Sequence, residues 1–222
     1  MSGGPLIAVV DYGMGNRRSV EKALDHVGAR ALITNDHDQL RAADGLVVPG
    51  VGAFPRAMEN LNKLRLVSLI RDRAASGTPL LGICLGMQLL FERSEERGMT
   101  DGLGLLEGEV TWLQGGGLRV PHIGWNEVSF ERRSELTNGL PEGGCAFYHV
   151  HSLAPRPSRP EDIVGTTEYG ERFATIVARG SVSAVQFHPE KSSAHGLRVL
   201  RNFVFVCAGG REPAREPASA RA

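Results

Sequence analysis

The stretch Gly82-Ile83-Cys84-Leu85-Gly86 directly follows the apolar run at 79–81. It predicts a buried strand that turns sharply at Cys84 and continues into a helix over 87–91. Such a turn lifts a side chain clear of the backbone, and the N–H groups at the start of the helix favour a thiolate. A single cysteine in an apolar stretch is more often a small core residue. Other parts of the chain must therefore decide whether Cys84 is a nucleophile.

Strands and helices alternate through the first half of the chain. Apolar runs predict strands at 6–10, 31–33 and 45–48. Helical patterns occur around 20–27 and 58–76. This alternation is typical of a parallel sheet with helices on both faces.

The second half of the chain contains strand-like runs and only one long helix. The strand-like runs lie at 107–113, 144–150, 174–178 and 182–187, and the helix at 193–206. The late part of the sheet is therefore expected to be mixed or antiparallel. Together the two halves predict an α/β fold, an open and mostly parallel or mixed sheet with helices on both faces.

Length and composition favour one domain. We expect it to span 1–208, followed by a disordered tail at 209–222 that has almost no apolar side chains and two prolines. Lys and Arg number 25, as do Asp and Glu, so the formal net charge is zero and indicates neither nucleic acid nor an anionic membrane as partner.

Cysteine usage and the N-terminus predict a cytoplasmic protein. The three cysteines are odd in number and far apart, which is typical of a reduced chain; Cys145 and Cys207 are interpreted as structural. No apolar run is long enough to span a membrane, and no basic region precedes an apolar one at the start. The histidines lack ligand spacing and Gly13-Met14-Gly15 does not match a phosphate-binding loop, so we expect neither a metal nor a cofactor.

A nucleophilic cysteine needs a base, and His188 is the candidate. It ends a strand-like run and precedes Pro189, which favours an extended backbone at His188. Side chains two positions apart in an extended segment point the same way, so Glu190 is predicted to hold the imidazole. Both Cys84 and His188 lie at predicted strand ends, where chemistry gathers in α/β sheets. His26, His37 and His195 are interpreted as unrelated to the chemistry.

An acyl-transfer site also needs donors for an oxyanion. The turn formed by Gly50, Val51 and Gly52 follows the third predicted strand, at the same end of the sheet as Cys84. Glycines there let backbone N–H groups approach a substrate carbonyl. The N–H of Leu85, directly after the nucleophile, is the second predicted donor. Taken alone, this turn is also compatible with an ordinary tight loop.

Two stretches, Gly82 to Gln88 and Gln186 to Ser192, resemble the class I (triad) glutamine amidotransferase family. Further stretches resemble one subfamily, the glutaminase subunit of imidazole glycerol phosphate synthase from histidine biosynthesis. They are Asp11-Tyr12-Gly13-Met14-Gly15-Asn16, Pro49-Gly50-Val51-Gly52-Ala53-Phe54, Pro121-His122-Ile123-Gly124-Trp125-Asn126 and 148–152. The resemblance extends from Leu6 to about Val206 and implies a flavodoxin-like fold with a strand, nucleophile elbow and helix.

The resemblance implies a role for each matching residue. Cys84 would attack the side-chain amide of glutamine and form a γ-glutamyl thioester, with His188 moving the protons and Glu190 orienting His188. Gln88 would hold the amino-acid end of glutamine. Backbone groups of Val150, His151 and Ser152 would also bind the amino-acid end of glutamine. In this family the Gly50 to Gly52 loop is thought to be misoriented at rest and rearranged by the partner.

The implied partner is a (β/α)8 barrel cyclase that receives ammonia through its interior. The pair would form a heterodimer that makes imidazole glycerol phosphate and an aminoimidazole carboxamide ribonucleotide. Asn16, His122, Trp125 and Asn126 are candidates for the docking face, although Trp125 fits core packing equally well.

Two departures from the family pattern flank the presumed glutamine site. His149 stands where an aromatic or apolar residue is expected, and Leu153 where tyrosine is common. The alternatives are the glutaminase of another amidotransferase, for pyridoxal phosphate or anthranilate synthesis, and a standalone cysteine hydrolase. The stretches at 11–16 and 121–126 argue against the first. Few insertions that could build a larger substrate cleft argue against the second.

Overall fold

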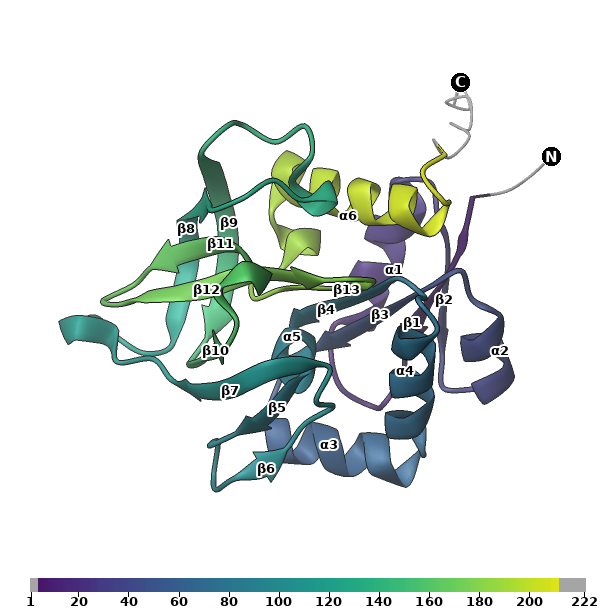
Figure 1. The fold of residues 1–222 in the computed structure, drawn as a ribbon, viewed down its shortest axis with the longest axis horizontal. Helices are drawn as coiled ribbons and strands as arrows, with labels where there is room; N and C mark the ends of the chain where they lie inside the picture. Colours follow the sequence, from purple (N-terminus) through teal and green to yellow (C-terminus); the bar gives the residue numbers. More distant parts are fainter. Residues whose placement is uncertain (1–3, 212–222) are drawn as a thin grey trace.

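The computed structural model describes residues 4–211 and contains a nine-stranded sheet in the order β2-β1-β3-β4-β13-β12-β11-β8-β9 (Figure 1). The first five strands are parallel and the remaining pairs are antiparallel. The helices are α1 (Arg17–His26), α2 (His37–Ala42), α3 (Phe54–Lys63), α4 (Leu66–Ala75), α5 (Leu85–Leu89) and α6 (Ser193–Cys207). This confirms the predicted mixed α/β architecture.

The large sheet contains two strands that the sequence did not predict, β8 and β11, whereas the run predicted at 107–113 belongs to a second sheet. The strands of the large sheet are β1 (Leu6–Val10), β2 (Arg30–Thr34), β3 (Gly45–Gly50), β4 (Leu80–Cys84), β8 (His122–Phe130), β9 (Gly144–His151), β11 (Ile163–Glu168), β12 (Arg172–Arg179) and β13 (Val182–Val185). The second sheet has the order β10-β7-β5-β6. Its strands are β5 (Phe91–Ser94), β6 (Thr100–Asp101), β7 (Leu106–Trp112) and β10 (Leu153–Pro157).

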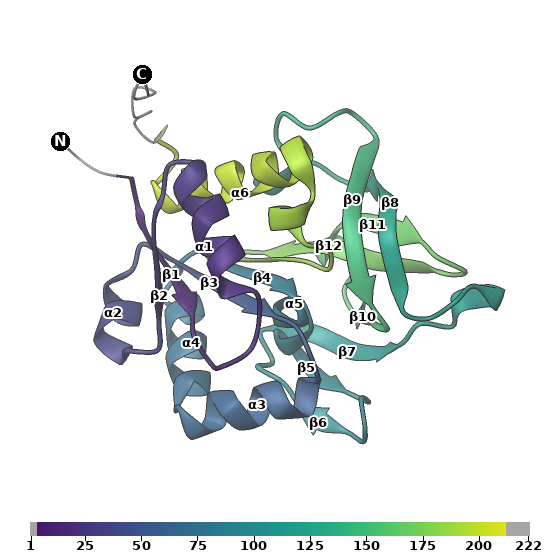
Figure 2. The same ribbon diagram turned by 180° about the vertical axis from the view of Figure 1, so that it is seen from behind.

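Both faces of the parallel part of the sheet are covered. In β1, Ile7 and Val9 pack under α1 and α6, whereas Ala8 and Val10 face the layer of α2, α3 and α4. Figures 1 and 2 show α1 and α6 on one face and α3, α4 and the second sheet on the other. Strands buried on two faces read as continuous apolar runs, which is why the early strands were recognisable from sequence.

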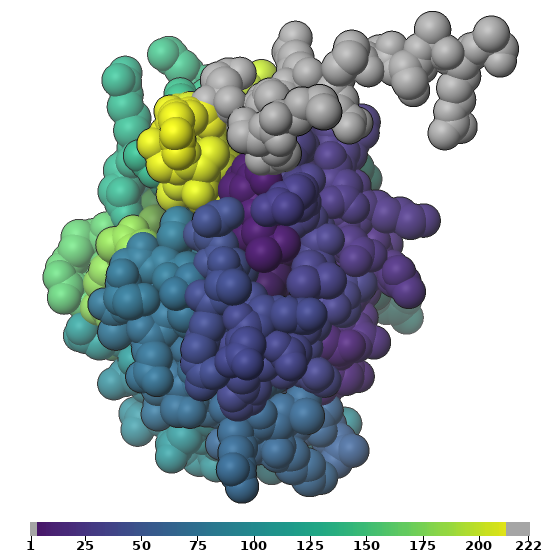
Figure 3. All heavy atoms as spheres, turned by 90° about the vertical axis from the view of Figure 1, so that its right-hand side faces the viewer, coloured from purple at the N-terminus to yellow at the C-terminus, as the bar shows by residue number. Residues whose placement is uncertain are grey.

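The two halves of the chain lie mainly at opposite ends of the long axis of the molecule. β8 and β9 form one end, while the opposite end is covered mainly by the first half of the chain, purple to blue in Figure 3. No helix within residues 4–211 combines the length and the apolar character needed to cross a bilayer. The tail predicted to be disordered lies, from residue 212 on, outside the described residues.

Several local predictions were wrong. The helix expected over 58–76 is two helices, α3 and α4, because the chain turns at Arg65, which adopts a φ of 55°. The helix α2, which was not predicted, begins at His37, and the preceding Asp36 caps it by accepting from the N–H groups of Asp38 and Gln39. The helix after Cys84 ends at Leu89, and Phe91 already belongs to β5.

The parallel ladder brings three strand ends together. Gly50, the last residue of β3, pairs in register with Cys84, the last residue of β4. On the other side of β4, Val185 at the end of β13 pairs with Ile83. The segments that follow these three strands therefore leave the sheet side by side, which positions the candidate site.

Candidate active site

Cys84 lies at a sharp turn between β4 and α5. Its backbone has φ 55° and ψ −113°, and the residue is 5% exposed. The turn is tight because the backbone of α5 crosses close over β3: a Cβ added at Gly86 would lie 1.7 Å from the carbonyl oxygen of Val48. A side chain at this position does not fit, so Gly86 is what lets the chain reverse directly after Cys84.

His188 and Glu190 lie beside Cys84. His188 has an extended backbone, as predicted, and its Nδ1 is 2.9 Å from Oε1 of Glu190. The local reason differs from the prediction, because residues 189–191 form a 3₁₀ turn rather than continuing the strand. Pro189 fixes a backbone angle suited to the first position of such a turn. The turn carries Glu190 back under the imidazole.

The electrostatic environment favours the protonated form of His188. Burial lowers the pKa of His188, but its hydrogen bonds with Cys84 and Glu190 outweigh burial and raise that pKa to about 10. The Glu190 side chain is 1% exposed, and within the described residues its Oε2 has no hydrogen-bond partner. The carboxylate therefore acts on the imidazole alone. The arrangement can hold a thiolate next to an imidazolium, which is the reactive state of a cysteine nucleophile.

Ser192, for which no role was predicted, fixes the backbone of His188. Its hydroxyl donates to the carbonyl oxygen of His188 at 2.7 Å and accepts from the N–H of Tyr148 at 3.0 Å. The N–H of His188 in turn donates to the carbonyl oxygen of Tyr148 at 2.9 Å. These bonds join the histidine to β9. A serine four residues after the base was the only signal in the sequence.

The predicted oxyanion loop lies against the turn at Cys84. Gly50 is buried, Val51 is 43% exposed, and Gly52 has a φ of 107°. A Cβ at Gly50 would lie 2.4 Å from the hydroxyl of Tyr12 and 2.8 Å from Cβ of Leu85. Leu85 is the first residue of α5, so its N–H has no acceptor within the helix. Gly50 and the start of α5 are thus in close contact beside Cys84.

Tyr12, predicted only as part of a motif, holds the segment that leads into this loop. Its hydroxyl donates to the carbonyl oxygen of Pro49 at 2.5 Å. Burial, with a smaller contribution from the charge of Cys84, raises the pKa of Tyr12, so the phenol stays protonated and remains a donor. Tyr12 therefore fixes the peptide that leads into Gly50.

The residues predicted to bind substrate lie on two elements: Val150 and His151 on β9, with Ser152 directly after it, and Gln88 on α5. The carbonyl oxygen of Val150 lies 3.7 Å from Sγ of Cys84, and Ser152 is half-buried near it in sequence. Gln88 lies on α5 with its Nε2 donating to the carbonyl oxygen of Leu153 and to Oε1 of Gln186, both at 3.1 Å. The imidazole of His151 is buried and faces other histidines. Only the backbone of that residue is available to a substrate.

Three histidines are packed together behind this region. His149 and His122 stack with ring centroids 4.8 Å apart, and Nδ1 of His122 is 3.1 Å from Nε2 of His151. Both ring nitrogens of His149 are paired, one with the carbonyl oxygen of Phe147 and the other with the hydroxyl of Thr175. The departure at His149 is therefore accommodated by hydrogen bonds inside the core.

These buried histidines predict sensitivity to acid. Burial lowers the pKa of His122 to about 4 and that of His149 well below its ordinary value, while the pKa of His151 falls to about 3. Below about pH 6.5 the unfolded chain binds protons that the folded chain refuses, so acid lowers the free energy of unfolding. Each such proton is worth about 1.4 kcal/mol per pH unit.

We therefore expect His149→Phe to flatten the loss of stability on acidification. Between about pH 6.5 and about pH 4.5, the free energy of unfolding measured with urea should fall less steeply than in the unmodified chain. His26→Phe, on the exposed side of α1, is the matched control and should leave the slope unchanged. Equal slopes in the two variants would contradict a neutral, buried His149.

The candidate docking residues differ in exposure. Trp125 is 55% exposed, which rules out core packing, and Asn126 and Asn16 are half-buried. His122 is 2% exposed, so its side chain is not part of a docking face. Burial under Tyr169, 4.0 Å away between ring centroids, explains the difference. Other exposed apolar side chains near Trp125 in sequence are Leu118, Val120 and Ile123.

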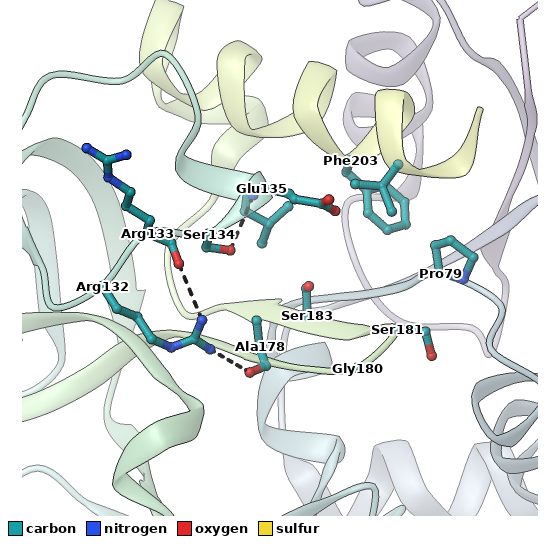
Figure 4. Close-up of a pocket in the computed structure, with 12 residues that line it drawn as sticks. Pro79, Arg132, Arg133, Ser134, Glu135, Ala178, Gly180, Ser181, Ser183 and Phe203 are labelled. Carbon is teal, nitrogen blue, oxygen red and sulfur yellow. Dashed lines mark hydrogen bonds between the residues drawn. The ribbon is translucent and has the colours of Figure 1, made fainter. Parts of the chain in front are cut away.

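A cavity of about 380 Å³ lies at the opposite end of the sheet, between α6, the β12–β13 turn and residues 132–136 (Figure 4). Pro79 and Ser181, which line it, directly precede β4, which ends at Cys84, and β13, after which His188 follows. None of the predicted site residues lines it. In Figure 4 Arg132 is held by the carbonyl oxygens of Ala178 and Arg133 rather than pointing into the open space.

Comparison with known proteins agrees with this geometry. Residues 8–207 match the family model described as glutamine amidotransferase class-I. The chain is 54% identical over 197 residues to the imidazole glycerol phosphate synthase subunit HisH of Moorella thermoacetica, covering 89% of this chain and 93% of the relative. It is 50% identical over 196 residues to the HisH subunit of Aquifex aeolicus, covering 88% and 94%.

Among solved structures, a chain of PurLQS from Thermotoga maritima superposes with a TM-score of 0.74 at 20% identity, covering 91% of this chain and 99% of that one. That likeness concerns the fold alone. The matches to relatives extend over nearly the whole domain and confirm the resemblance inferred from the motifs. The chain therefore belongs to the class I glutamine amidotransferase family and, within it, to the HisH subunits of imidazole glycerol phosphate synthase.

Proposed function

We propose that this chain hydrolyses glutamine to glutamate and ammonia through a thioester on Cys84. The observation that carries the proposal is the position of Cys84 at a tight strand-to-helix turn, beside the end of β13 from which His188 follows, with the imidazole of His188 held by Glu190 at 2.9 Å. A nucleophile, a base and an orienting carboxylate are the three parts that acyl transfer by a cysteine requires.

The first half-reaction forms the thioester. The sulfur of Cys84 attacks the side-chain amide carbon of glutamine, and the carbonyl oxygen becomes an oxyanion near the loop at Gly50 and the N–H of Leu85. His188 carries the proton taken from the thiol and gives it to the departing nitrogen, so ammonia leaves as the carbon–nitrogen bond breaks. A γ-glutamyl thioester remains on the sulfur.

The second half-reaction releases glutamate. His188, now neutral, takes a proton from water while the water oxygen attacks the thioester carbon. The carbon–sulfur bond breaks, and the sulfur leaves as a thiolate beside the newly protonated His188. Glu190 keeps the imidazole oriented and offsets its charge in both steps.

Gln88 suits the amino-acid end of the substrate. Both N–H groups of its amide point inward, to Leu153 and Gln186. The amide oxygen is therefore left to accept from the ammonium group of a bound glutamine.

The ammonia needs a protected path, because in water it would take up a proton and lose its nucleophilic lone pair. We propose that the exposed face around Trp125 docks against a (β/α)8 barrel cyclase, the other part of imidazole glycerol phosphate synthase, which takes up ammonia in its interior. Large exposed apolar side chains gathered in one region are typical of protein interfaces.

The test is the rate of glutamate release from glutamine by the purified chain, alone and with a cyclase partner holding its ligand. We expect little release alone and a rise of at least about a hundred-fold in the complex, the scale on which aligned oxyanion donors act. Substantial, equal turnover without the partner would contradict the proposal and indicate a free-standing hydrolase.

Two tryptophan variants locate the docking face. Trp125→Ala removes the exposed side chain on β8 and should weaken the stimulation by the partner. Trp112→Ala is the matched control, since Trp112 is 44% exposed on β7. Equal loss of stimulation in both variants would contradict docking at β8.

A further inference from the structure

A buried chain of hydrogen bonds begins at the sulfur of Cys84. Nε2 of Gln186, a residue with no exposed surface, donates toward Sγ at 3.7 Å. Oε1 of the same side chain accepts from Nε2 of Gln88 at 3.1 Å, and this nitrogen also donates to the carbonyl oxygen of Leu153 at 3.1 Å. Two amides thus link the nucleophile to the junction of β9 and β10.

The chain continues from Leu153 to β8. The carbonyl oxygen of Leu153 pairs with Nδ1 of His151 at 2.9 Å, and Nε2 of His151 pairs with Nδ1 of His122 at 3.1 Å. Nε2 of His122 lies 3.2 Å from Nδ2 of Asn126. The members of this buried chain are Asn126, His122, His151, Leu153, Gln88 and Gln186.

The partners fix the tautomer of each histidine in the buried chain. The amide nitrogen of Asn126 can only donate, and its oxygen accepts from the N–H of Glu127, so Nε2 of His122 must accept. A neutral His122 then carries its proton on Nδ1 and donates to Nε2 of His151. His151 in turn carries its proton on Nδ1, which faces the carbonyl oxygen of Leu153. One assignment satisfies every partner.

This assignment leaves no room for an additional proton. A proton on Nε2 of His122 would face the amide protons of Asn126, and one on Nε2 of His151 would face the N–H of His122. The lowered pKa values of both histidines agree with this mismatch. At neutral pH the buried chain is therefore uncharged and has one hydrogen-bonding pattern.

The direction of the bonds shows what the buried chain can transmit. Leu153 accepts from His151 on one side and from Gln88 on the other, so the bonds converge on one oxygen and no proton can pass through it. The buried chain can hold its side chains in fixed positions but cannot conduct protons. A displacement of β8 at Asn126 would shift the donors along these hydrogen bonds and, at their end, the amide of Gln186 that faces the sulfur.

We propose that Gln186 is a positioning residue for the sulfur of Cys84, and that the buried chain ties it to β8 beside Trp125. The proposal deepens the proposed function and rests on it, since it names how a partner docked on β8 would regulate the nucleophile. An amide N–H aimed at the sulfur stabilises the thiolate relative to the thiol. Through this contact the buried chain of hydrogen bonds would control the reactivity of Cys84.

The first test is Gln186→Met, which has a similar length and no donor. The rate of alkylation of Cys84 by iodoacetamide is followed against pH in the full chain, by mass spectrometry of the peptide that contains it. We expect the pH midpoint to rise by about one unit, because a hydrogen bond to a charged group is lost. Gln114→Met, at an exposed glutamine, is the matched control. An unchanged midpoint would overturn the role of Gln186.

The second test changes Asn126, at the other end of the buried chain, and can be carried out even if Gln186→Met does not fold. Asn126→Asp replaces the amide donor by an oxygen, so Nε2 of His122 must take a proton. Nitrogen–proton spectra of the imidazoles should show the Nδ1–H tautomer at His122 and His151 in the unmodified chain, and a proton on Nε2 of His122 in the variant. The alkylation midpoint of Cys84 should move as well.

Ser129→Asp adds the same charge on an exposed position of β8 and should change neither readout. An Nε2–H tautomer at His122 or His151 in the unmodified chain, or a reversed tautomer with no change at Cys84, would overturn the proposal. Neither measurement uses glutamine or a partner. Failure of the buried chain is thus distinct from failure of the glutaminase assignment, which would appear as absent glutamate release with both readouts intact.

Discussion

Cys84→Ala is expected to abolish glutamate release while the complex still makes product from added ammonia salts. Without sulfur no thioester forms, and removing a nucleophile costs on the order of 10⁶-fold in rate. The fold should persist, because the change removes a single atom. Synthesis from ammonia should persist too, since the proposed partner does that chemistry. The measurement is glutamate formation beside ammonia-dependent product formation in the same complex.

Cys145→Ala is the matched control for this experiment. Cys145 is buried on β9, and burial raises the pKa of its thiol to about 11, so it is protonated and unreactive at neutral pH. Its replacement should leave both activities. Glutamate release that survives Cys84→Ala, or ammonia-dependent synthesis that disappears with it, would refute the proposed division of labour.

Gly86→Ala is expected to cause the largest loss of stability of any single methyl added to the chain near the site. The new Cβ would lie 1.7 Å from the carbonyl oxygen of Val48, a backbone atom of the central strand β3 that cannot turn aside. Overpacking of this severity costs about 3 kcal/mol or more. Urea unfolding should show it as a lower midpoint with a similar slope.

Gly165→Ala separates this effect from the general cost of filling a buried glycine. A Cβ at Gly165 would meet only side-chain methyls, at 3.0 Å for Val128 and 3.2 Å for Ile176. These methyls can give way by small shifts, so the expected loss is about 1 kcal/mol. Similar losses of stability in the two variants would show that the turn at Cys84 can relax, contrary to the close approach of α5 to Val48 of β3.

The sequence predicted the parallel half of the fold better than the remainder. β1, β3 and β4 are buried on both faces, so their apolar runs were sufficient to identify them. β8 alternates buried and exposed residues through His122, Gly124 and Trp125, and its polar positions hid it. β5 begins with Phe91, which also fits the helical pattern before it. Tertiary pairing with β7 decides in favour of a strand.

The candidate site was predicted through residues whose chemistry is local. Cys84 lies two residues from Gly82 and Gly86, and His188 and Glu190 flank Pro189, so short stretches were enough to predict the local backbone. Gln186 and Tyr12 act over long sequence distances, on Cys84 and on Pro49, and no local pattern reveals such contacts. His122 was named a candidate for the docking face through the family resemblance, whereas strand alternation turns its side chain inward.

The register of β3 and β4 has a consequence for how this architecture can change. Gly50 and Cys84 are opposite residues of adjacent strands, so nothing can be inserted between those strands without separating the oxyanion loop from the nucleophile. The outer strand β2 has one free side in the described sheet, whereas the outer side of β9 is bonded at Tyr148 to His188 and Ser192. We therefore expect extra strands or appended modules at the β2 margin, and the rest of the sheet must keep its order for as long as the chemistry is kept.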